Sequence, residues 1–116
     1  MTEDKLYDLS MVREISRGSD EFVTKMVQLF IETTISAVNE MKGNLQKEEW
    51  DSIGSIAHKI KSSIDTMGIV SIKEDIRLLE KYGKERIQLN EIPELINKID
   101  STIEKVNSKL KEEVGL

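Results

Sequence analysis

Apolar residues recur at spacings of three and four along most of the chain, and this period decides which regular structure it can form. A period near 3.6 residues lays one apolar stripe along an α-helix, whereas a strand needs strict alternation. Alternation rich in β-branched residues is missing, and the one proline, Pro93, stands where the first turn of a helix tolerates it. The spacing therefore predicts an all-α chain.

The apolar stripes predict one short helix and four long helices. The short helix is expected over about residues 8–16, and the long helices over about 20–46, 48–67, 70–82 and from 90 onward. The residues expected to cap or end these helices are Asp8, Gly18, Ser19 or Asp20, Gly68, Gly83 and Asn90.

Four long amphipathic helices with short connections predict an up-down-up-down four-helix bundle. The short N-terminal helix is expected to cap one end of this bundle. No composition shift or linker divides the sequence, so we expect residues 1–116 to form a single domain. A bundle without any chemistry would show the same stripes, so function has to be inferred from other residues.

Composition argues against several functional classes. The chain has no cysteine and only one histidine, which argues against disulfides, thiolate metal sites and a zinc site. Its formal charge of −5 argues against a nucleic-acid-binding role. No apolar run approaches the roughly 20 residues that span a bilayer, and the acidic N-terminus lacks the apolar core of a signal peptide. We therefore expect a cytoplasmic protein with no metal, cofactor, nucleic-acid or membrane partner.

His58, the only histidine, falls one position off an apolar stripe, at the edge that should face solvent. Its expected helix neighbours, three and four positions away, are Gly54, Ser55, Lys61 and Ser62. Small residues around an exposed imidazole suggest room for a large partner, although a surface histidine without a role is the plainer interpretation. Glycine inside a helix costs roughly 1 kcal/mol relative to alanine, so Gly54 needs a reason, either access to His58 or close packing of another helix.

The chain offers no sign of an enzyme with its own active site. No sequence context activates a serine or pairs His58 with a catalytic carboxylate, and no glycine-rich nucleotide-binding loop is present. A neutral imidazole is nevertheless a good nucleophile near neutral pH. The remaining chemistry is that His58 accepts a group from a partner, with Lys61 neutralising charge on an incoming phosphoryl group.

The segment around His58 resembles the signature of histidine-containing phosphotransfer (HPt) domains. The family pattern is Ala-His-x-hydrophobic-Lys-Gly-Ser, followed about five residues later by an apolar-Gly pair. This chain has Ala-His-Lys-Ile-Lys-Ser-Ser over residues 57–63 and then Met67-Gly68. Further segments with a family-like character are Tyr7-Asp8-Leu9-Ser10, Glu21-Phe22, Leu29-Phe30 and Glu49-Trp50. The resemblance therefore covers essentially the whole chain.

The resemblance implies a role for each residue of the candidate site. His58 would carry the phosphoryl group and Lys61 would contact it, while Ser62 replaces the usual glycine and adds a hydroxyl. Family members often hold the other imidazole nitrogen with a Gln or Glu on the next helix, and Glu80 is the best candidate. The alternative for Glu80 is a plain salt bridge with Lys61 or Lys84.

By the same resemblance, the protein is a free-standing relay module. It would accept phosphate from an aspartate on a response-regulator receiver domain of a phosphorelay that includes a hybrid histidine kinase, pass it to another receiver, act as a monomer, and lack autokinase activity. Candidates for the apolar rim of the docking surface are Met11, Ile15 and Phe22. The rival interpretation is a helical adaptor that binds a receiver or kinase without accepting phosphate.

Overall fold

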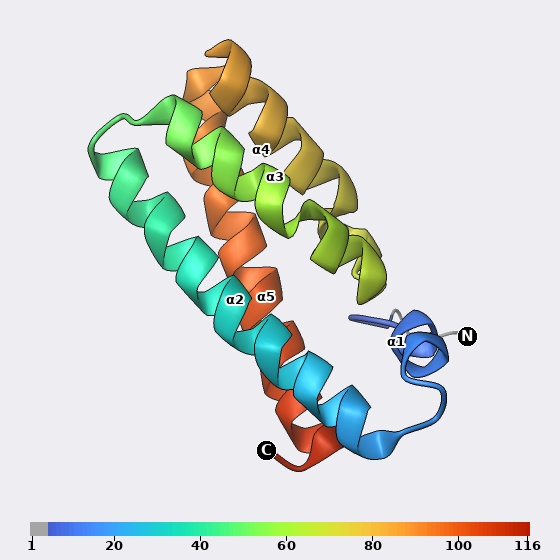
Figure 1. Cartoon of the computed structure of the whole chain (residues 1–116). Helices are drawn as coiled ribbons and strands as arrows, with labels where there is room; N and C mark the ends of the chain where they lie inside the picture. Colours follow the sequence, from blue (N-terminus) through green and yellow to red (C-terminus); the bar gives the residue numbers. More distant parts are fainter. Residues whose placement is uncertain (1–4) are drawn as a thin grey trace.

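The computed structural model describes residues 5–116 and contains five α-helices and two short 3₁₀ helices. Within these residues there is no β-strand. The helices are α1 (Ser10–Ile15), α2 (Asp20–Gln46), α3 (Trp50–Thr66), η1 (Val70–Ile72), α4 (Lys73–Glu85), η2 (Leu89–Glu91) and α5 (Ile92–Val114). The prediction of an all-α chain with one short and four long helices is therefore confirmed (Figure 1).

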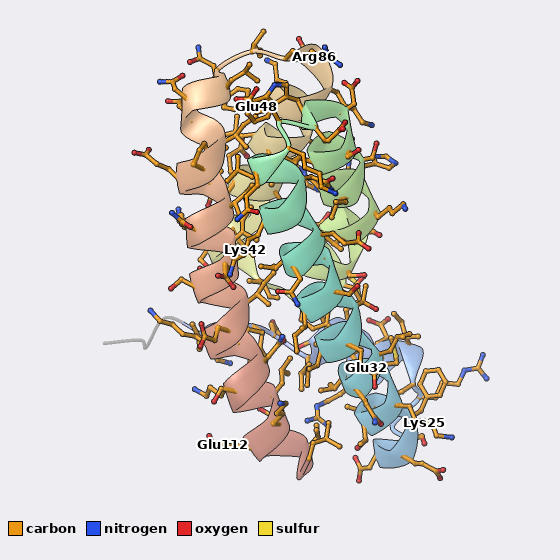
Figure 2. The ribbon with its side chains drawn as sticks, turned by 90° about the vertical axis from the view of Figure 1, so that its left-hand side faces the viewer. Lys25, Glu32, Lys42, Glu48, Arg86 and Glu112 are labelled. Atoms are coloured by element: carbon orange, nitrogen blue, oxygen red, sulfur yellow. The ribbon has the colours of Figure 1, made fainter. Side chains whose placement is uncertain are left out.

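The four long helices form an up-down-up-down bundle in which α2 packs against α3 and α5, and α4 packs against α3 and α5. Figure 2 shows the alternation in direction. Glu48, in the α2–α3 connection, and Arg86, in the α4–α5 connection, lie at one end of the bundle, whereas Lys25 and Glu112 lie at the other. No helix within residues 5–116 is long and apolar enough to cross a membrane.

The predicted apolar stripes form the core. Isoleucines dominate it, and those on α3, α4 and α5 are almost completely shielded from solvent. Burying each such side chain contributes roughly 1.5–3 kcal/mol relative to leaving it exposed. The long stripe residues with at most 2% exposure include Ile53, Ile60, Ile64, Ile76, Leu79, Ile92, Ile96, Ile99 and Leu110.

Helix boundaries follow some of the predicted signals and depart from others. The Ser19 hydroxyl accepts a hydrogen bond from the backbone N–H of Phe22, and Gly68 ends the α3 region with a φ of +65°. Gly83, by contrast, does not end α4, which continues to Glu85 and stops at Arg86 in the left-handed conformation. Asn90 lies inside η2 rather than capping α5. For Gly83 the reason is its packing against Gly54 and Trp50 of α3, which outweighs the local tendency of glycine to end a helix.

α1 lies beyond the end of the α3–α4 pair, beside the N-terminal part of α2 (Figure 1). The Asp8 backbone N–H donates to the Met67 carbonyl oxygen at 2.9 Å, which joins the segment before α1 to the end of α3. Tyr7 donates its hydroxyl to Glu113 at 2.8 Å on α5. Burial and this neighbouring carboxylate raise the pKa of Tyr7 to about 12. The short helix and the segment before it therefore lie at one end of the bundle, as the sequence predicts.

One buried polar contact joins α2 to α5. The Asn107 Nδ2 group donates to the Thr34 hydroxyl oxygen at 3.1 Å, and that hydroxyl donates in turn to the Phe30 carbonyl at 2.8 Å. Asn107 Oδ1 is shielded from solvent and has no hydrogen-bond partner within residues 5–116. This contact interrupts an otherwise apolar stripe.

Candidate functional site

α3 presents His58 at the surface while burying the residues on either side of it along the apolar stripe. Ala57 and Ile60 are buried, and these two positions anchor the helix face next to His58. The His58 side chain is 58% exposed. The predicted position one step off the stripe is therefore confirmed, because a helix that buries one face must expose the adjacent edge.

Glu80 on α4 binds His58 across the α3–α4 interface. Its Oε2 lies 2.6 Å from His58 Nδ1, and its Oε1 accepts a hydrogen bond from Lys61 Nζ at 2.8 Å. Lys84, one turn further along α4, donates to Oε2 at 3.3 Å. Only 16% of the Glu80 side chain is exposed. One carboxylate thus joins two residues of α3 to a lysine of its own helix.

The surroundings of Glu80 keep it ionised and define which His58 nitrogen is free. Hydrogen bonds from Lys61, then His58 and Lys84, lower the pKa of Glu80 from 4.5 to about 2, against an opposing contribution from burial. A carboxylate that is ionised at neutral pH can only accept hydrogen bonds. His58 Nδ1 must therefore carry the proton in the neutral ring, which leaves the lone pair on Nε2.

Lys61 is only partly exposed and pairs with a carboxylate of the neighbouring helix. Its side chain is 29% exposed and its ammonium is engaged by Glu80. The two alternatives for Glu80, an imidazole partner and a salt bridge, are both realised at once. Lys84 was predicted only as a possible salt-bridge partner of Glu80, and its position four residues after Glu80 is the usual spacing of a helix ion pair.

Gly54 does not contribute to an open space around His58. It is buried against α4, where the backbone of Glu80 and Lys84 lies next to its Cα. Close packing of another helix is thus the reason for this glycine, and the access interpretation is wrong. Its counterpart on α4 is Gly83, which is also buried.

Ser62 borders a shallow groove between α2 and α3, with a volume of about 290 Å³, one turn from His58. Ile15 and Leu29 line the same groove and are 53% and 64% exposed. Met11 and Phe22, the other two predicted rim residues, are also exposed. Leu29 was recognised only as part of a family-like pair, because an apolar residue off the main stripe has no distinguishing sequence signal.

The remaining charged residues near the site have other contacts. Arg77 binds Asp65 through both terminal nitrogens, at 2.6 and 3.2 Å. This pairing lowers the pKa of Asp65 and raises that of Arg77.

Lys59 is exposed. Residues 5–116 contain no group of three or more histidine, cysteine or acidic side chains arranged to hold a metal ion.

Comparisons with known proteins identify the family and support the fold. The sequence model described as the Hpt domain matches residues 25–109, which is most of the chain and includes the α3–α4 site. The fold is similar to the crystal structure of histidine-containing phosphotransfer protein B (HptB) from Pseudomonas aeruginosa PAO1, with a TM-score of 0.86, 18% identity and 97% of each chain covered. A search of curated protein sequences finds no match. The protein belongs to the Hpt domain family, the histidine phosphotransfer modules of two-component signalling.

Proposed function

We propose that this protein relays a phosphoryl group between receiver-domain aspartates, with His58 Nε2 as the acceptor atom. The contact between His58 Nδ1 and the Glu80 carboxylate carries this proposal. It explains how an imidazole on an exposed helix edge is held in one orientation and one tautomer. Residues 57–63, together with the family match, supply the chemical context.

The transfer of the phosphoryl group from aspartate to His58 needs no external acid or base. The Nε2 lone pair attacks phosphorus, the new N–P bond forms, and the bond between phosphorus and the donor aspartate oxygen breaks so that the carboxylate leaves. Nδ1 keeps its proton, so the ring gains positive charge as the bond forms. The ionised Glu80 carboxylate at 2.6 Å stabilises this charge where it develops.

Lys61 is suited to stabilise the negative charge on the phosphoryl oxygens in the same transition state. It lies three residues after His58, and its ammonium has three donors, of which one engages Glu80. The other donors can face phosphoryl oxygens while the ion pair with Glu80 persists. We therefore assign Lys61 to phosphate contact and Glu80 to orientation of the ring.

The exposed apolar residues beside the groove suit a receiver domain as partner. Ile15 on α1 and Leu29 on α2 line the same groove as Ser62, and Phe22 on α2 is also exposed. Contiguous exposed apolar side chains rimmed by polar ones are typical of protein interaction sites. Binding there would place the partner next to His58. The hydroxyl of Ser62, where the family usually has glycine, would face the same partner.

The decisive experiment is phosphorylation of the protein and of His58→Gln by a panel of phosphorylated receiver domains. The wild type should acquire a label that is lost in acid and kept in base, as expected for a phosphoramidate, whereas His58→Gln should stay unlabelled. Lys59→Gln, an exposed neighbour on the same helix, is the matched control and should be labelled at the normal rate. Labelling of His58→Gln would refute the assignment. Receiver binding without any labelling of the wild type would favour an adaptor.

A further inference from the structure

α3 and α4 meet through two glycines whose backbones are in direct contact. A Cβ atom on Gly83 would lie 2.7 Å from the Gly54 backbone nitrogen and 2.7 Å from the Trp50 carbonyl oxygen. A Cβ atom on Gly54 would lie 2.9 Å from the Lys84 backbone nitrogen and 3.0 Å from the Glu80 carbonyl oxygen. Ordinary contacts with carbon are roughly 3.5–4 Å long, so any larger residue at either position forces the helices apart.

The register of this contact places it next to the candidate site. Gly83 follows Glu80 by three residues, and Gly54 precedes His58 by four, so each glycine lies one turn from a partner in the hydrogen bond. The main chain of Glu80 itself touches the Gly54 position. The separation of α3 and α4 at the two glycines therefore sets the position of the Glu80 Cα atom relative to α3.

We propose that Gly54 and Gly83 are positioning residues that hold α4 close enough to α3 for Glu80 to engage His58 and Lys61 together. This inference rests on the proposed phosphoryl transfer at His58 and adds how its orientation is maintained. Relieving the 2.7 Å contacts requires a separation of about 1 Å. The same displacement would lengthen the 2.6 Å contact to His58 Nδ1 to roughly 3.6 Å, which is no longer a hydrogen bond.

The test compares Gly83→Ala with Gly43→Ala, an alanine substitution in the interior of α2. A Cβ atom at Gly43 meets nothing within 4 Å, so Gly43→Ala should raise the unfolding temperature by roughly 2–5 °C and leave transfer unchanged. Gly83→Ala should slow labelling by a phospho-receiver roughly tenfold, as expected for loss of one charge-assisted hydrogen bond.

A spectroscopic readout separates positioning from a loss of stability. In ¹⁵N NMR spectra recorded at pH 8.5, above the usual titration range of imidazole, the ring nitrogens of the wild type should report a dominant Nδ1–H tautomer. Gly83→Ala should shift this population toward the Nε2–H form. Glu80→Gln should then slow transfer less in the Gly83→Ala background than in the wild-type background, because Gly83→Ala has already removed the contact between Glu80 and His58.

The proposal would be overturned if Gly83→Ala folds and shows the same tautomer populations and the same transfer rate as the wild type. If Gly83→Ala does not fold, Gly54→Ala, whose contacts are 0.2–0.3 Å longer, takes its place, and wild-type values in that variant would overturn it equally. The tautomer is measured without phosphate, so it tests the positioning role by itself. Phosphoryl transfer at His58 is tested separately, because labelling of His58→Gln would refute it.

Discussion

Replacing Glu80 by glutamine is expected to destabilise the protein at neutral pH and to lose that effect in acid. The pKa of Glu80 falls from 4.5 to about 2 in the folded protein, chiefly because of Lys61. Each pKa unit corresponds to roughly 1.4 kcal/mol, so the ceiling of the ionised contribution is about 3 kcal/mol. The His58 and Lys84 side chains are about half exposed, and solvent screening therefore reduces the expected loss to about 1–2 kcal/mol.

The sign of the pH dependence follows from the lowered pKa. The stabilisation is fully present above the unfolded-state pKa of 4.5 and is lost as the pH falls toward the folded-state pKa of about 2. Roughly half of the difference between wild type and Glu80→Gln should be gone at pH 3.

Urea unfolding curves at pH 7, 5 and 3 measure this dependence directly. Glu40→Gln makes the same chemical change at an exposed position on α2, and its effect should stay within about 0.5 kcal/mol at every pH. A Glu80→Gln penalty of equal size at pH 7 and pH 3 would refute the reasoning, because it would then come from packing rather than from the ionised carboxylate.

Three further outcomes are expected. Lys61→Ala should lower the free energy of unfolding by about 1 kcal/mol through its ion pair with Glu80 and slow phosphoryl acceptance more than this loss explains; normal transfer would assign Lys61 to stability alone. Ile64→Ala, at a fully buried position on α3, should cost about 2–5 kcal/mol in urea unfolding, and a cost below 1 kcal/mol would contradict the core described above. The purified chain should acquire no label from ATP alone, and labelling under those conditions would argue against a carrier without autokinase activity.

The sequence predicted the bundle well because helical periodicity is a local property that burial in one shared core then reinforces. His58 and Lys61 were proposed as site residues from their spacing and their family-like surroundings. The contacts of Glu80 were only partly predictable, since two alternatives fitted its position and the structure satisfies both. Gly83 was misassigned because a glycine near a helix end reads as a terminator, and its partner, Gly54, lies on another helix.

The polar contact between Thr34 and Asn107 has a consequence for how α5 finds its place along the bundle. A slip of α5 by seven residues would put Ile99 where Ile92 packs, and Ile103 where Ile96 packs, so these isoleucines alone are degenerate. The same slip would bring Val114 opposite the Thr34 hydroxyl and move Asn107 to the position of Asp100, so the hydrogen bond between Thr34 and Asn107 would be lost. With Asn107 Oδ1 left without a partner within residues 5–116, the pair adds little net stability. The pair instead favours one alignment of α5 along the bundle. An alignment shifted by seven residues would bury isoleucines at the same places but would lose this hydrogen bond, just as a single buried asparagine specifies the register of a coiled coil.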